Sequence, residues 1–231
     1  MRKFQFGSML MAGLLALVVL VPSSYAVVLN PGDTGLAPDI FAANGGVDNG
    51  APIVNDTGVQ VFTGVDARGN TQYTGNFRQI VVRDTVTNLL DFVYEIEVTN
   101  GPSAVDRLTT INFAGTNTDV GYCSNCPDVI TLNSLGDGNI VPNTVDRSSD
   151  GNVIGFNFTG GVHAGGDTFA LVIKTNASFA DFTGSTTVLD GGIAAVNSYN
   201  PVPEPMNAGL LLGGLFGVGL FVARKFQVRQ S

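Results

Sequence analysis

Apolar and polar residues alternate along the middle of the chain with the two-residue period of β-strands. In the clearest case Phe92, Tyr94, Ile96 and Val98 alternate with acidic residues such as Glu95. Because successive side chains of a strand point to opposite faces, this segment predicts a strand with one buried and one solvated face. Similar alternation occurs at Val59, Val61 and Val65, at Ile80 and Val82, at Ile111 and Phe113, at Ile154, Phe156 and Phe158, and at Phe169, Leu171 and Ile173.

Turn-forming residues separate these segments. Residues 85–88 and the run Asn100-Gly101-Pro102-Ser103 are two examples, and residues 27–58 are a turn-rich lead-in with short strands at most. Short alternating strands with turn signals about every 8 to 15 residues are typical of an antiparallel sandwich. The sequence therefore predicts an all-β exported domain with an antiparallel, immunoglobulin-like β-sandwich fold.

The N-terminus has the order of parts of a secretory signal peptide. Arg2 and Lys3 precede an apolar stretch from about Met9 to Val21, which is followed by the small-residue site Ser24-Tyr25-Ala26. We expect cleavage after Ala26. A retained anchor helix is the alternative reading, but about 13 apolar residues are short for a membrane span.

The C-terminus carries a longer apolar segment. Met206 to Ala223 is 18 residues without a charge, which as a helix is about 27 Å long, enough to cross a bilayer. Arg224 and Lys225 follow as a stop-transfer signal and favour a cytoplasmic end. Residues 1–26 are thus the expected signal peptide, 27–200 the exported domain and 201–231 the tail, whose basic end is 224–231.

The order of parts in this tail resembles a PEP-CTERM sorting domain. The resemblance lies in Val202-Pro203-Glu204-Pro205, the run Leu210 to Leu215, and then Arg224-Lys225. It implies an exported bacterial protein that an exosortase, a membrane transpeptidase-like enzyme, cuts near Pro203, Glu204 and Pro205. The basic cluster is shorter than in many members. An ordinary C-terminal anchor after a Pro-rich linker is the alternative reading.

Composition limits the partners of the exported domain. Residues 27–200 contain six Lys/Arg and 18 Asp/Glu, a net charge of −12, and Lys174 is the only lysine. Because phosphate contacts need Lys and Arg, this balance argues against binding nucleic acid or anionic lipid by charge.

The stretch 90–100, LDFVYEIEVTN, resembles the repeating strand of immunoglobulin-like bacterial surface modules.

The two cysteines, Cys123 and Cys126, are separated by two residues. Export places them in an oxidising compartment, so we expect a disulfide that shapes its loop more than it stabilises the fold. A redox pair would need a helix after it, whereas a strand-like run follows. A zinc site would need a second cysteine pair, and His163 is the only histidine.

Asp146, Ser148 and Asp150 place oxygen atoms at alternate positions before Gly151, like the first half of a calcium loop. The twelfth position is Asn157, so the bidentate glutamate of such loops is missing. A hairpin turn at Asp150-Gly151 explains the same residues, and calcium stays only a weak candidate.

The sequence contains only weak candidates for catalytic groups. Glu95 and Glu97 are about 7 Å apart if they share a strand face, near the carboxyl spacing of some glycosidases, but a solvated strand face produces the same pair. His163 is most simply a loop residue, and the exported part lacks GxSxG, HExxH and phosphate-cradling motifs. We therefore expect no enzymatic activity, no catalytic residues and no cofactor.

The sequence as a whole predicts a non-enzymatic surface or extracellular-matrix protein associated with exopolysaccharide. We expect export through a membrane-anchored intermediate to the envelope or matrix of a Gram-negative-type bacterium, with an exosortase-like enzyme, the membrane and extracellular polysaccharide as partners and no nucleic acid. A glycan- or calcium-binding module is the alternative from a second class. A secreted hydrolase, which rests on Glu95 and Glu97 alone, is the third.

Overall fold

The computed structural model describes residues 27–41, 51–123 and 138–203. These ranges form fourteen strands and no helix, which confirms the all-β prediction. The strands are β1 (Val27–Val28), β2 (Asp39–Phe41), β3 (Ile53–Asp56), β4 (Gln60–Val65), β5 (Thr71–Arg83), β6 (Leu90–Asn100), β7 (Val105–Thr110), β8 (Thr118–Cys123), β9 (Thr144–Arg147), β10 (Ile154–Val162), β11 (Gly166–Asp167), β12 (Ala170–Thr175), β13 (Phe179–Asp190) and β14 (Gly192–Val202).

The two predicted terminal helices lie outside the described residues. Residues 1–26 and 206–223 therefore keep their signal-peptide and membrane-helix assignments as predictions only. In the ranges that the structure describes, no helix is long and apolar enough to span a membrane.

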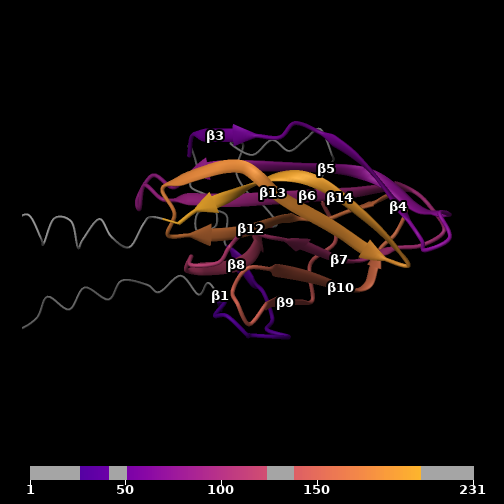
Figure 1. Cartoon of the computed structure of the whole chain (residues 1–231), viewed down its shortest axis with the longest axis horizontal. Helices are drawn as coiled ribbons and strands as arrows, with labels where there is room; N and C mark the ends of the chain where they lie inside the picture. Colours follow the sequence, from indigo (N-terminus) through magenta and orange to yellow (C-terminus); the bar gives the residue numbers. More distant parts are fainter. Residues whose placement is uncertain (1–26, 42–50, 124–137, 204–231) are drawn as a thin grey trace, which may run out of the picture.

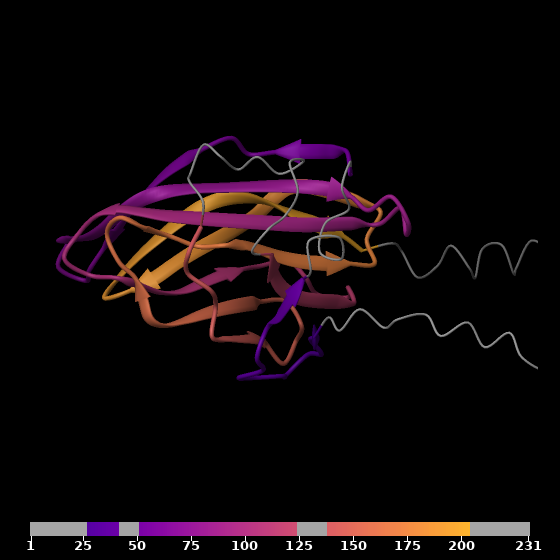
Figure 2. The same ribbon diagram turned by 180° about the vertical axis from the view of Figure 1, so that it is seen from behind.

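All the strands join one curled sheet. Its order is β1-β8-β12-β6-β5-β4-β14-β13-β7-β10-β9, with β2 beside β8, β3 beside β5 and β11 beside β6. The strand pairs are antiparallel except β2 with β8. The curl brings β5 and β6 over β7 and β10 (Figure 1), and the view from behind shows the same arrangement (Figure 2). One face of the sheet can therefore enclose a core.

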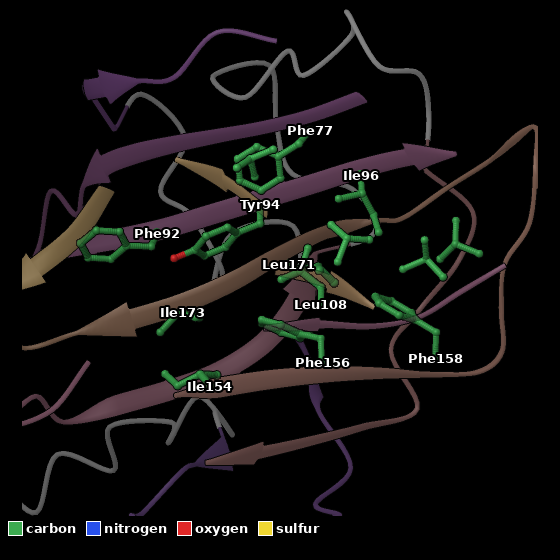
Figure 3. Packing of buried hydrophobic residues seen from close by; sticks show 14 of the residues in the cluster. Phe77, Phe92, Tyr94, Ile96, Leu108, Ile154, Phe156, Phe158, Leu171 and Ile173 are labelled. Carbon is green, nitrogen blue, oxygen red and sulfur yellow. The ribbon is translucent and has the colours of Figure 1, made fainter. Parts of the chain in front are cut away.

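The core fills the inside of this curl. Phe77, Tyr94 and Ile96 point from β5 and β6 toward Leu108 and Phe156 on the facing strands (Figure 3), and all five are buried. Burying such a side chain stabilises the fold by about 1.5–3 kcal/mol. The alternation from residue 92 to 98 is confirmed, because each of its apolar side chains belongs to this core.

The prediction that the other face of β6 is wet is wrong. A second apolar cluster covers it, so that Asp91 and Glu95 are each only 2% exposed and Val93 is fully buried. The cluster consists of Phe41, Ala51, Ile80, Val82, Val93, Cys123 and Val172. Residues far along the chain pack onto this face, which a period-2 pattern cannot show.

Two other segments also differ from the expected pattern. Val61 and Val65 of β4 are exposed, whereas Phe62 between them faces the core. The strand is thus predicted correctly, but its valines point outward. Ile111 and Phe113 lie beyond the end of β7 in a loop where Asn112 has a positive φ of 73°. That left-handed conformation ends the strand.

The sheet has a weak internal junction between β4 and β14. These strands pair at a single position, Val65 with Ile193. The buried side chain of Gln79 replaces the missing backbone hydrogen bonds at this junction. Its Nε2 donates to the Tyr199 carbonyl at 2.8 Å, and its Oε1 accepts from the Tyr199 N–H at 2.6 Å. Gln60 adds a bond from its Nε2 to the Asn197 carbonyl at 2.8 Å.

The two outer ends of the sheet meet at a seam. Leu36, which follows β1 along the chain, bridges Val145 of β9 through hydrogen bonds of 3.1 and 2.8 Å. The side chain of Arg147 crosses this seam and is 3% exposed. It donates at 2.8–3.0 Å to the carbonyls of Leu29, Phe113, Thr116 and Gly151 and to Oγ1 of Thr118.

Arg147 therefore makes five hydrogen bonds, as many as a guanidinium has N–H groups, and every acceptor is neutral. Burial lowers the pKa of this guanidinium. The group nevertheless stays charged, because an arginine guanidinium is effectively always protonated in proteins. We conclude that Arg147 holds the ends of the sheet together.

Candidate functional site

The predicted sorting motif begins where the last strand ends. β14 ends at Val202, and Pro203 is the first residue of the Pro203-Glu204-Pro205 motif. Glu204 and Pro205 lie outside the described residues, as do Arg224 and Lys225. Pro203 lies beside Gly115, at which an added Cβ would come within 3.8 Å of the proline ring.

The other predicted boundary is equally close to a strand. The described part of the chain begins with β1 at Val27, and the predicted cleavage site Ala26 lies outside the described residues. Val27 pairs with Val120 of β8. β1 and the end of β14 lie toward the same end of the molecule (Figure 1), which we call the exit end.

A tight turn between β5 and β6 forms part of the exit end. The carboxylate of Asp84 accepts hydrogen bonds from the N–H groups of Val86 and Thr87 and from the Thr87 hydroxyl. Burial raises the pKa of Asp84, but these hydrogen bonds and the charge of Lys174 lower it below its usual value overall. The Arg83 guanidinium donates to the Ser178 carbonyl at 3.1 Å, which joins this turn to the start of β13.

The opposite end of the molecule is acidic. Asp66, Asp106 and Asp190 lie in or next to its loops, and His163 is exposed in the loop after β10, as the sequence predicted. Burial and the negative charge of Asp106 raise the pKa of Asp190, whereas His163 lowers it. Asp66 is bonded within its own turn, where its carboxylate accepts from the N–H groups of Arg68 and Asn70.

Cys123 ends β8 and is buried in the second apolar cluster. Its sulfur is disulfide-bonded. The predicted partner Cys126 lies outside the described residues, so the geometry of the loop is not part of the described structure.

The calcium candidate does not form a converging set of ligands. Asp146 faces the Arg107 guanidinium in a two-armed ion pair, and it also accepts from Nδ2 of Asn157 at 2.8 Å. Ser148 instead donates to Asp150 within the turn before β10. Burial raises the pKa of Asp146, but Arg107 and Asn157 lower it below its usual value. An arginine at the first ligand position disfavours a bound cation.

Gly151 forms the hairpin turn that the sequence predicted as the alternative to a calcium loop. Its φ is +72°, a conformation that glycine adopts without strain. Asp150 accepts from the Asn152 N–H at 3.0 Å. Within the described residues, no three His, Cys, Asp or Glu side chains form a group that could hold a metal ion.

Glu95 and Glu97 lie on the same face of β6, but their surroundings differ from the solvated pair that we expected. Glu95 is buried and lies opposite Arg78 of β5, whose pKa is raised mainly by its hydrogen bond to Asp56 and further by the charge of Glu95. Glu97 accepts from Nδ2 of Asn76 at 2.8 Å. The two carboxylates are engaged by different neighbours, which does not favour a shared reaction centre.

Sequence reasoning missed the surroundings of Lys174. In the sheet register Lys174 lies between Asp91 of β6 and Asp119 of β8, and its Nζ is 4.0 Å from Asp84 and 5.4 Å from the centre of the Phe41 ring. Burial raises the pKa of Asp119, an effect that Lys174 partly offsets. We interpret this group as charge compensation under the second apolar cluster.

No family model, no curated protein and no solved structure matches this chain.

Proposed function

We propose that this protein is a non-enzymatic surface or extracellular-matrix protein, exported through its N-terminal signal and sorted through its C-terminal PEP-CTERM-like tail. In this proposal an exosortase-like enzyme processes the chain near Pro203, Glu204 and Pro205. The exported domain then remains at the cell surface or in the exopolysaccharide.

One observation carries the proposal: all the strands that the structure describes lie between the two predicted processing sites. β1 starts one residue after Ala26, and β14 ends one residue before Pro203. Cleavage after Ala26 or next to Glu204 would keep every strand pair that the structure describes. The exported domain can therefore keep its fold after both cuts.

We further propose that the domain is a sandwich-like, immunoglobulin-like spacer. Support comes from the two groups of strands, one around β5 and β6 and the other around β7 and β13, which contribute facing side chains to one core. The weak β4–β14 junction, with its single residue pair, lies between these groups. A closed, fully packed module of this kind suits a structural role at a surface.

The test replaces Pro203, Glu204 and Pro205 with alanine in the full chain, in a host that carries an exosortase. The parent should lose its tail, give a mature N-terminus at Val27 and reach the surface. The triple variant should keep its tail and accumulate in the inner membrane. Intact mass and membrane fractionation measure both outcomes.

A matched control replaces the exposed Pro102, in the turn after β6, with alanine. This variant should be processed like the parent, because it changes a proline far from the tail. If the triple variant were also sorted and processed like the parent, the sorting proposal would be refuted.

A further inference from the structure

Exposed apolar side chains surround the point at which the chain leaves β14. Val86 is 84% exposed and Phe179 is 68% exposed. Phe179 pairs with Val202 across β13 and β14, and the bond from Arg83 to the Ser178 carbonyl holds the turn of Val86 next to them. We call this group the exit patch; it consists of Val86, Phe179, Phe182 and Val202.

Charge is sparse around the exit patch. The loops 84–89, 112–117 and 176–179 contain one charged residue, Asp84, whose buried carboxylate is bonded within its own turn and lies 4.0 Å from Lys174 Nζ. Arg83, directly before this turn, is half-buried and donates to the Asn88 and Ser178 carbonyls. Asp181 is exposed between the two phenylalanines of the patch, and it accepts from the Thr183 hydroxyl. An apolar, partly aromatic rim with few charges suits the headgroup region of a bilayer.

The tail brings this patch to a membrane. The uncharged segment starts at Met206, three residues after Pro203, and three residues span at most about 10 Å. A bilayer that holds residues 206–223 would therefore keep the exit patch next to its surface at a high effective concentration. The second exposed apolar group, Val61, Val65 and Ile193, lies on the outer side of β4 and β14, and Ile193 is about 30 Å from Val202 along β14.

We propose that the exit patch docks on the lipid bilayer while the tail holds the protein, so that the domain stands on the membrane by its exit end. This inference rests on the proposed function, which places the tail in a membrane. Insertion of Val86 and Phe179 removes apolar surface from water. Because residues 27–200 carry a net charge of −12, the contact should be stronger on zwitterionic than on anionic lipid.

Tryptophan fluorescence tests the docking directly, because the chain contains no tryptophan. The full chain with Phe179→Trp is reconstituted into phosphatidylcholine vesicles that contain doxyl-labelled lipid. Its emission should be quenched and should lie at shorter wavelength than in detergent. Ile193→Trp is the matched control, since Ile193 is also exposed, at 61%, but lies at the opposite end of β14. Its emission should remain unquenched.

A second pair of variants addresses the patch itself. Val86→Asp, added to Phe179→Trp, should reduce the quenching, because a charge then has to approach the lipid. Val65→Asp, far from the patch, should leave the quenching unchanged. Replacing part of the phosphatidylcholine with phosphatidylglycerol should also lower the quenching, because of the negative net charge of the domain.

Each result separates the inference from the proposed function. If the protein does not float with the vesicles, the membrane-held tail and with it the proposed function are refuted. If it floats but Phe179→Trp is not quenched, only the docking is refuted. Equal quenching of both tryptophan variants would mean that the domain lies flat, and a concentration-dependent shift of Phe179→Trp in detergent would mean that a second copy covers the patch; either result overturns the inference.

Discussion

The sheet has two places with few backbone hydrogen bonds between strands, the β4–β14 junction and the seam, and a different kind of side chain bridges each of them. At the β4–β14 junction the neutral amide of Gln79 both donates to and accepts from the backbone of Tyr199. At the seam between β9 and the N-terminal segment, Arg147 only donates, and its five bonds go to neutral acceptors. A junction with one free N–H and one free C=O fits an amide, whereas a seam with several free carbonyls fits a guanidinium.

The side chains next to these two places also differ in charge: a neutral tyrosine lies near the β4–β14 junction, whereas an ion pair lies next to the seam. Tyr73 is buried near the β4–β14 junction, where its hydroxyl lies 2.8 Å from the Val188 carbonyl and 2.9 Å from the Gly192 carbonyl. Burial raises the pKa of Tyr73 to about 12, so the group stays neutral. Next to the seam, in contrast, Asp146 and Arg107 form an ion pair across β9 and β7. The comparison predicts that the seam depends on charge and the junction does not.

The largest expected effect comes from Arg147→Leu. This change leaves four carbonyls and the Thr118 hydroxyl in a buried seam without their donor, which should cost roughly 3–5 kcal/mol of the free energy of unfolding. Urea unfolding of the domain measures it. Arg147→Lys should recover only part of the loss, because an ammonium has three donors and no planar fork.

Arg68→Leu is the control for this prediction, since Arg68 is exposed in the turn after β4. Its effect should stay within about 0.5 kcal/mol. A stability of Arg147→Leu equal to that of Arg68→Leu would contradict the role of Arg147 at the seam.

A smaller loss is expected for Gln79→Leu. The variant removes both bonds to Tyr199, which should lower the free energy of unfolding by about 1–3 kcal/mol. Hydrogen exchange of the Tyr199 amide is the local measurement, and it should accelerate. Gln60→Leu, which removes one bond to Asn197 at a half-exposed position, should cost less.

Gln79→Glu sharpens the comparison. An ionised carboxylate accepts from the Tyr199 N–H but cannot donate to its carbonyl, and burial disfavours the charge. The variant should therefore be less stable at pH 7 than at pH 4. Equal stability at both pH values would show that the junction tolerates a charge as the seam does.

The smallest expected effect is a pH dependence next to the seam. The pKa of Asp146 is below its usual value in the folded protein because of Arg107 and Asn157, although burial acts in the opposite direction. A lowered folded pKa means that this stabilisation is complete above the unfolded pKa, near 3.8, and is lost as the pH falls through the folded pKa. Because both side chains of the ion pair are partly exposed and screened by solvent, the effect should be on the order of 1 kcal/mol or less.

Asp146→Asn should remove this part of the pH dependence. Unfolding curves between pH 7 and pH 2.5 compare the variant with the parent. The exposed Asp181→Asn is the control, and it should follow the parent over the whole range. If Asp146→Asn kept the acid sensitivity of the parent, the ion pair would not contribute to the seam.

Much of the local structure can be predicted from the sequence. The strand around Tyr94, the turns at Asn100-Gly101 and Asp150-Gly151, and the strand around Phe156 all occur where the pattern places them. The sequence also predicts two processing boundaries, at Ala26 and Pro203, because the expected signals depend on local residues. It could not show that Glu95 is buried, because Phe41, Ala51 and Val172 cover that region from distant parts of the chain.

The same limit applies to the sites. Cys123 and the turn around Asp150 were found from spacing alone. Arg147 and Gln79 were missed, because a polar residue in a strand has the same local sequence pattern whether its side chain is exposed or crosses a seam. The two-residue period at Val61 and Val65 predicted a strand but did not determine which face meets the core.

The sequence by itself determined the period of the strands and the turns between them, and it predicts signals at both ends, since each of these depends on residues close together in the chain. Only the tertiary structure decided which strand face is buried and how the sheet is closed. Gln79 meets Tyr199 across 120 residues, and Arg147 meets Leu29 across 118. Such contacts depend on the pairing of whole strands, and no local pattern encodes them.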